Sequence, residues 1–346
     1  MDIDEAAAVA RLALDAFGLS SDASIAFVKH RENHVFRADV DDASYAVRVH
    51  RSGYHSDGEI RTELEYVRAL RDAGVPVPDV LATRDGSPFA RVTAGDRVHL
   101  VSLQRWLVDA QQFGDVDAAV DGTHAPEAAA FTEIGAMLAE LHVATARIGE
   151  PDGFERAAWD ADGLAGRAPL WGDPRALRSL DAEARALLDT AVPALHDRLR
   201  RLGTDPDRYG VVHADATPEN ILRCGDGFVL IDFDDFGTGW FVFDLVTALF
   251  FYTGHPRAAE YERALLEGYE AIRPLSEAEH GAWDALDLAR GLSYLGWAAD
   301  RPDDPASAFI AEAIAPRVLR AATAFVTGDR APWRAADAPD HAGATA

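Results

Sequence analysis

Four polar residues with a distinctive spacing stand out in the second half of the chain. His213, Asp215 and Asn220 form the pattern H-x-D-x-x-x-x-N directly after a short apolar run, and a second apolar run ends at Asp232. A carboxylate can orient and deprotonate a hydroxyl, and amide and carboxylate oxygens are ligands that Mg²⁺ accepts. Phosphoryl transfer requires these parts, with Asp215 as the base and Asn220 and Asp232 as metal ligands.

Each of these residues alone also has a structural interpretation. An H-x-D segment can be a loop end whose side chains cap nearby backbone, and Asp232 can be the N-cap of a helix. The combined spacing is more specific. It follows the kinase catalytic loop and the metal-binding Asp-Phe-Gly, with Asp234 at the glycine position. We therefore favour the interpretation as a phosphoryl-transfer site.

The two motifs resemble those of the aminoglycoside phosphotransferase and choline kinase family. The matching segments are residues 213–222 and 231–245, and the resemblance extends over about residues 24–325. It implies an α+β, bilobal, protein-kinase-like fold, with a small β-rich N-lobe and a larger helical C-lobe. It also implies a phosphotransferase that uses ATP and Mg²⁺ to phosphorylate a hydroxyl of a small molecule.

The resemblance also implies roles for single residues. The catalytic base of the family corresponds to Asp215, and its metal ligands correspond to Asn220 and Asp232. His213 and Asp244 would support the site, Asp244 as a buried aspartate that steadies the catalytic loop. Asp244 could equally cap the helix that begins beside it, and the two roles are compatible.

The first lobe should supply a cation for the phosphates of the nucleotide. In kinases this cation is a strand lysine paired with a helix glutamate, and Arg48 stands at that position. Lys29, the only lysine of the chain, is our second choice, because it precedes the hairpin turn on an earlier strand. The resemblance favours Glu63 as the partner, whereas periodicity alone leaves Glu59 and Glu65 open.

Three further residues complete the predicted nucleotide site. Asn33 lies in the turn 30–34, which would cover the phosphates although it contains no glycine. Gln104 lies in the segment 104–107, which resembles the hinge whose backbone faces adenine. Ile231 directly precedes the predicted metal ligand.

Hydrophobic periodicity predicts how the chain is divided. Residues 1–103 form the N-lobe with a leading helix, 104–107 the hinge, 108–327 the helical C-lobe and 328–346 a disordered tail. In the first lobe, apolar alternation and turn residues predict five strands and one later helix. The strands are 24–29, 34–40, 44–50, 80–83 and 97–103, and the helix is 57–72.

Composition limits the partners. The 346 residues include 33 basic and 58 acidic ones, for a net charge of −25, which argues against nucleic acid and anionic membranes. A single cysteine, Cys224, excludes an internal disulfide and a multi-cysteine metal site. The acidic start lacks a signal-peptide pattern, and no apolar run is long enough to span a bilayer, so we expect a cytoplasmic protein. Oligomeric state stays open.

The acceptor is predicted to carry an amine. Carboxylates and aromatic rings attract a cation, and the candidates are Asp234, Asp235, Tyr294 and Trp297. An aminosugar, an amino alcohol or a homoserine-like amino acid would fit. The alternatives are a Ser/Thr protein kinase of the bacterial stress type and a nucleotide-binding module with weak catalysis.

Overall fold

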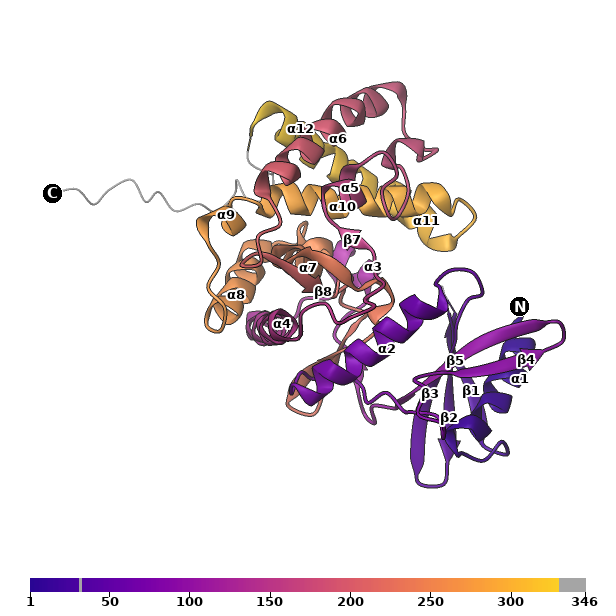
Figure 1. Cartoon of the computed structure of the whole chain (residues 1–346). Coiled ribbons are helices and arrows are strands. Elements are labelled where there is room, and N and C mark those ends of the chain that lie inside the picture. The colour runs from indigo at the N-terminus through magenta and orange to yellow at the C-terminus, as the bar shows by residue number, and fades with distance from the viewer. Residues whose placement is uncertain (31–32, 330–346) are drawn as a thin grey trace. The chain divides into compact units, whose positions relative to one another are not determined.

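A five-stranded antiparallel sheet dominates the N-terminal part of the computed structural model, which describes residues 1–30 and 33–329 (Figure 1). In the strand β2, every second residue is buried, which is the pattern of a strand with one face against a core. The spatial order is β1-β2-β3-β5-β4. The strands are β1 Ser24–His30, β2 His34–Val40, β3 Ala43–Val49, β4 Ala90–Ala94 and β5 Arg97–Arg105.

The helix α1 (Ile3–Ala13) covers one face of this sheet. It begins with a capping box between Asp2 and Glu5, continues as one 3₁₀ turn and ends at Gly18, whose φ of 78° suits a residue without a side chain. Its buried residues and those of β2, β3 and β5 share one hydrophobic core. The core sets the position of β3, which carries Arg48.

The helix α2 spans Asp57–Asp72, as predicted, and begins with a capping box at Ser56. The predicted strand 80–83 is wrong, because only Val80 forms a bridge, opposite Gln104. The strand β4 was not predicted, since its inward residues include two alanines, which give a weak alternating signal.

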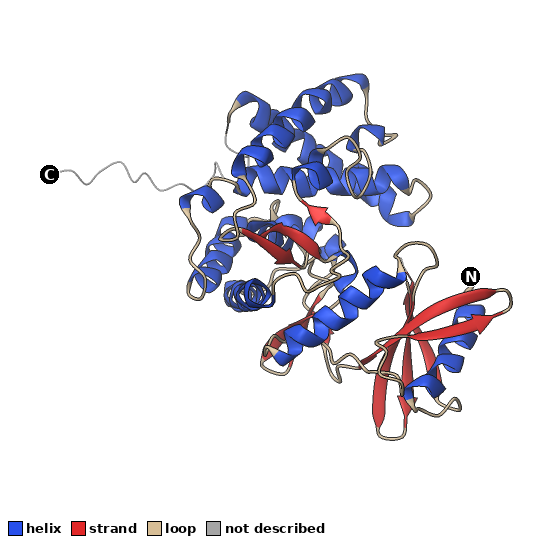
Figure 2. Cartoon of the chain, viewed as in Figure 1, coloured by secondary structure: helices blue, strands red, loops and turns tan. Residues whose placement is uncertain are grey.

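Helices dominate the rest of the described chain, as the coloured cartoon shows (Figure 2). Two three-stranded sheets lie among them, with the orders β10-β9-β6 and β7-β11-β8. The longer helices are α4 Ala128–Ile148, α6 Ala182–Leu202, α7 Phe241–Leu249, α8 Ala258–Glu270, α10 Trp283–Asp300 and α12 Ala315–Thr327. The shorter ones are α3 Val116–Asp121, α5 Ala161–Ala165, α9 Glu277–His280 and α11 Pro305–Phe309. The short strands are β6 Gln111–Gln112, β7 Ala158–Trp159, β8 Tyr209–Val212, β9 Ile221–Cys224, β10 Gly227–Leu230 and β11 Gly237–Trp240.

Contacts group the chain into two compact units. Unit 1 comprises Met1–Gln111, Glu150–Arg156 and Leu222–Asp234, and unit 2 comprises the remaining segments. The predicted hinge lies in unit 1, where β5 continues through its first two residues to Arg105. Of the predicted tail 328–346, residues 330–346 lie outside the described residues.

In the part of the chain that the structure describes, no helix is long and apolar enough to cross a membrane.

The helices α4 and α8 of unit 2 pack unusually closely because glycines line their contact. A Cβ atom on Gly135 would lie 2.0 Å from the carbonyl oxygen of Leu265, and one on Gly268 would lie 1.9 Å from that of Thr132. Both distances are far below a van der Waals contact. The reciprocal arrangement sets the spacing of two helices that contribute to the site.

We predict that Gly268→Ala lowers the free energy of unfolding by about 1–3 kcal/mol, because the added methyl group must push the two backbones apart. Urea unfolding measures the change. Gly254→Ala is the matched control in the same unit, since a Cβ there meets nothing within 4 Å. Equal stability of the two variants would contradict the assignment of a close helix contact.

Candidate active site

The segment that follows β8 is held by the carboxylate of Asp244, in the first turn of α7. The backbone N–H groups of His213 and Ala214 donate to its two oxygens at 2.8 and 2.7 Å. Ala214 has a φ of 65°, a left-handed conformation that costs energy for a residue with a side chain. The two hydrogen bonds to Asp244 stabilise this backbone conformation, so the direction of the chain at the next residue, Asp215, is fixed.

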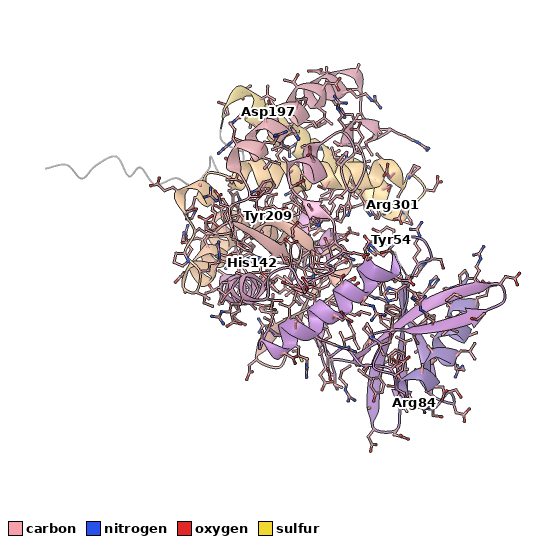
Figure 3. All side chains as sticks on the ribbon, viewed as in Figure 1. Tyr54, Arg84, His142, Asp197, Tyr209 and Arg301 are labelled. Carbon is pink, nitrogen blue, oxygen red and sulfur yellow. The ribbon has the colours of Figure 1, made fainter. Side chains whose placement is uncertain are left out.

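A chain of buried polar groups, which includes His142 (labelled in Figure 3), supports Asp244 on the side away from the loop. His142 Nε2 on α4 lies 3.0 Å from its Oδ2, and His142 Nδ1 lies 2.8 Å from the Tyr269 hydroxyl on α8. Arg273 donates to that hydroxyl at 3.2 Å, so Tyr269 can donate to His142 and His142 to Asp244. Burial would raise the pKa of Asp244, but the hydrogen bonds from His142 and His213 lower it, so the carboxylate stays ionised.

Both carboxylate oxygens of Asp215 are engaged within unit 2. Asn220 Nδ2 donates to Asp215 Oδ2 at 2.8 Å and to its carbonyl oxygen at 2.9 Å. The guanidinium of Arg290, on α10, donates to Oδ1. The Asp215 side chain nevertheless remains 22% exposed. The structure thus brings together the predicted base, one predicted metal ligand and an arginine.

In unit 1, Arg48 pairs with Glu63. Arg48 Nη2 donates to Glu63 Oε1, while Glu65 is exposed and pairs with Arg61. The pairing partner predicted for Arg48 is therefore confirmed, and its role toward a nucleotide stays a prediction. Burial would lower the pKa of Arg48, but Glu63 and the neighbouring aspartates raise it, so the guanidinium stays charged.

Asp232 and Asp234 also belong to unit 1, and they differ in exposure. The side chain of Asp232 is 40% exposed, its φ is 65°, and its Oδ1 lies 3.8 Å from Arg48 Nη1. Asp234 is buried, with Asn33 Nδ2 at 3.2 Å and His55 Nε2 at 3.7 Å. These contacts give Asp234 a role inside unit 1, and its predicted role toward an acceptor gains no support from them.

The remaining predicted nucleotide residues lie on separate elements of unit 1. Asn33 is buried, and its Oδ1 accepts a hydrogen bond from the Arg51 amide at 3.0 Å, while residues 31 and 32 of the same turn lie outside the described residues. Gln104 is half-buried on β5 opposite Ala46, and Ile231 is half-buried after β10. Lys29 lies on β1.

Among the predicted acceptor residues, Asp235 and Tyr294 share neighbours in unit 2. The Trp171 indole donates to Asp235 Oδ1 at 3.1 Å, and its ring lies 5.8 Å from that of Tyr294. Tyr294 accepts a hydrogen bond from Arg290 at 2.7 Å. Trp297, one turn further along α10, lies beneath the guanidinium of Arg301 instead.

Sequence reasoning missed three residues that the structure places around the site: His142, Trp171 and Arg290. His142 and Arg290 each fall in an apolar stretch of a long helix, where a polar side chain that keeps the helical period must find a buried partner. That signal marks a buried polar contact but names no partner. Trp171 lies between helices, in a loop that carries no periodic pattern.

The fold and the site together define a kinase-like phosphotransferase architecture, and the comparisons agree. Residues 25–289 match the sequence model of the phosphotransferase enzyme family, abbreviated APH. The chain belongs to this family. The predicted α+β, kinase-like bilobal fold is thereby confirmed.

Several relatives are kinases of small molecules. The chain is 34% identical to homoserine kinase of Rhizobium rhizogenes (strain K84) over 67% of its own length, and 25% identical to amicoumacin kinase of Bacillus subtilis (strain 168) over 68%. The matches span 66% and 64% of those two proteins. A solved structure of a microcompartment-associated aminopropanol kinase superposes with a TM-score of 0.81 at 30% identity, covering 94% of this chain and 99% of that one.

We predict that Asp244→Asn lowers the free energy of unfolding by about 2–4 kcal/mol, because an amide has one acceptor oxygen for three buried donors. Urea unfolding measures the loss. Asp197→Asn, at an exposed aspartate on α6, is the control and should leave stability within about 0.5 kcal/mol of wild type (Figure 3). If Asp244→Asn were as stable as this control, Asp244 would not be what holds the loop.

Proposed function

We propose that this protein transfers the γ-phosphoryl group of ATP to the hydroxyl of a small, amine-bearing acceptor. One observation carries the proposal: Asp215 has both carboxylate oxygens fixed, by Asn220 and Arg290, and still remains partly exposed. A carboxylate held in this way can accept the hydrogen bond of an acceptor hydroxyl. As the acceptor oxygen bonds to the γ-phosphorus, ADP leaves and Asp215 takes the hydroxyl proton.

Asn220 and Asp232 have the chemistry of Mg²⁺ ligands. Because Asn220 directs its Nδ2 to Asp215, its carbonyl oxygen is the atom available to a cation. Asp232 adds a carboxylate whose side chain is 40% exposed. Hard oxygen donors of this kind suit Mg²⁺, which neutralises phosphate charge when it is bound. Asp232 belongs to unit 1 and Asn220 to unit 2.

Arg48 supplies the cation for the nucleotide phosphates in this proposal. Glu63 holds one side of its guanidinium, and Arg48 Nε is buried without a hydrogen-bond partner among the described residues. A planar guanidinium can bind two phosphate oxygens at once through a rigid pair of donors, whereas the ammonium of a lysine acts as a compact point charge. Asn33, Gln104 and Ile231 stay in the proposed nucleotide site on the grounds of the family resemblance.

Asp235, Trp171 and Tyr294 are the proposed contacts of the acceptor amine. A carboxylate beside aromatic rings favours an ammonium group, which gains both ionic and cation–π stabilisation. Trp297 remains a candidate on the same footing: Arg301 lies over its ring, as Arg290 lies over the rings of Trp171 and Tyr294.

The named relatives support a small-molecule acceptor rather than a protein. Their names specify aminopropanol, homoserine and amicoumacin. A protein kinase of the stress type is therefore not favoured. An amino alcohol is our first choice, because the relative with that name matches over nearly the whole chain.

A coupled ADP-release assay tests the proposal directly. Aminopropanol, ethanolamine, homoserine and an aminosugar are offered with ATP and Mg²⁺, and each is matched by an analogue that lacks the amine. We expect at least one amine-bearing acceptor to stimulate ADP release, with roughly tenfold or more loss of kcat/KM for its amine-free analogue. Stimulation by a protein substrate alone would reverse the proposal.

Asp215→Asn should then lower kcat by roughly 10²-fold or more, because the amide cannot take the proton, while the fold is retained. Asp197→Asn serves as the control and should keep kcat within about twofold. Full activity of Asp215→Asn would remove Asp215 from the role of base.

Asp232→Ala should abolish the Mg²⁺-dependent part of nucleotide binding, because it removes a hard oxygen ligand. Calorimetric titration with ATP in Mg²⁺ or in EDTA separates this part from the rest. Asp226→Ala, at an exposed aspartate in the turn between β9 and β10, is the control. Unchanged affinity in Mg²⁺ would rule out Asp232 as a ligand.

A further inference from the structure

Arg290 is a fully buried arginine whose side chain reaches the segment that carries the proposed base. Its Nη2 donates to Asp215 Oδ1 and, at 2.7 Å, to the Tyr294 hydroxyl. Its Nη1 donates to the carbonyl oxygen of Ala214 at 3.0 Å. One guanidinium thus holds both the carboxylate of Asp215 and the backbone of the residue before it.

Aromatic rings surround the rest of this guanidinium. Its central carbon lies 4.6 Å from the ring centre of Trp171, 4.3 Å from that of Tyr294 and 5.7 Å from that of Phe243. A charged group in such surroundings is costly to bury, and an apolar side chain of similar volume would fill the same space at lower cost. Stability of the helix core alone therefore gives no reason for an arginine at this position.

The geometry at Asp215 gives such a reason. Asn220 fixes Oδ2 and Arg290 fixes Oδ1, so the carboxylate cannot rotate about its side-chain bonds. The contact with the Ala214 carbonyl oxygen adds a second hold on a residue in the left-handed conformation. The exposed part of Asp215 is thereby presented in one orientation. Misplacing a reacting group by about 1 Å can cost roughly 10²-fold in rate.

We propose that Arg290 is a positioning residue, which fixes the carboxylate of Asp215 and the backbone of Ala214 in the orientation that an acceptor hydroxyl requires. This inference rests on the proposed function, since it assumes that Asp215 meets the acceptor. It assigns to α10 a role in catalysis that is separate from any contact with the nucleotide.

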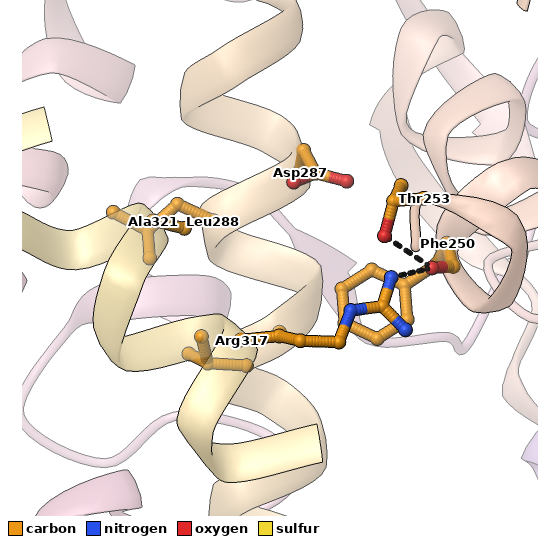
Figure 4. Close-up of a pocket in the computed structure, with 8 residues that line it drawn as sticks. Phe250, Thr253, Asp287, Leu288, Arg317 and Ala321 are labelled. Atoms are coloured by element: carbon orange, nitrogen blue, oxygen red, sulfur yellow. Dashed lines mark hydrogen bonds between the residues drawn. The ribbon is translucent and has the colours of Figure 1, made fainter. Parts of the chain in front are cut away.

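A half-buried arginine of unit 2 provides a control (Figure 4). Arg317, on α12, lies over the ring of Phe250 at 5.6 Å and donates to the carbonyl oxygen of that residue at 2.8 Å. Like Arg290, Arg317 contacts an aromatic ring and donates to a backbone carbonyl oxygen. The pocket that it lines, however, does not include Asp215 among its lining residues. Loss of Arg317 should affect stability without changing the orientation of the base.

The experiment compares Arg290→Met, Arg290→Lys and Arg317→Met at a temperature at which thermal unfolding shows each variant to be folded. For Arg290→Met, we expect kcat to fall by roughly 10²-fold while the KM for ATP changes by less than about threefold. The kcat of Arg290→Lys should be at least about tenfold higher than that of Arg290→Met, because an ammonium can still donate to Asp215. Arg317→Met should keep kcat within about threefold. Arg290→Met with wild-type kcat, or Arg290→Lys no better than Arg290→Met, would overturn the inference.

Amide hydrogen exchange tests the inference independently of the acceptor. If no acceptor in the panel stimulates ADP release by the wild-type protein, the proposed function fails. The exchange rate of the amides in the segment 213–216 then tests whether Arg290 fixes this backbone. Faster exchange there in Arg290→Met than in Arg317→Met supports the positioning role. Equal exchange in the two variants overturns it.

Discussion

The rest of the site depends on two hydrogen bonds, which the backbone N–H groups of His213 and Ala214 donate to the carboxylate of Asp244. They stabilise the left-handed conformation of Ala214, and this conformation determines where Asp215 points. The carboxylate can stay ionised in a fully buried position because His142 donates to it from α4. Hydrogen bonds thus connect α4 and α7, which are far apart in sequence, with the loop that follows β8.

Arginines lie beside the carboxylates that are proposed to act in phosphoryl transfer. Asp215 is paired with Arg290 in unit 2, and in unit 1 Asp232 lies near Arg48, which Glu63 holds in place. In a chain with a net charge of −25, Arg48 and Arg290 thus place positive charge directly beside these carboxylates. Local charge of this kind, rather than the overall negative field, decides whether a phosphate can bind.

Residues that lie on short, strongly patterned segments were predictable from the sequence. The helix α2 and the strand β2 have the predicted bounds, and Arg48 pairs with Glu63. The strand β4 was missed because its alternation rests partly on alanines. Arg290 and His142 could not be assigned roles, because their partners lie 75 and 102 residues away, and no local pattern encodes such pairings.

Phosphorus NMR of the reaction mixture identifies the atom that receives the phosphoryl group and so decides whether the protein is an O-phosphotransferase. With ATP, Mg²⁺ and the best amino-alcohol acceptor, we predict a phosphomonoester coupled to the carbinol protons of the acceptor, formed in step with ADP. The amine should still titrate in this product. A phosphoramidate, inorganic phosphate alone or a phosphorylated protein side chain would rule out transfer to the hydroxyl of a small acceptor.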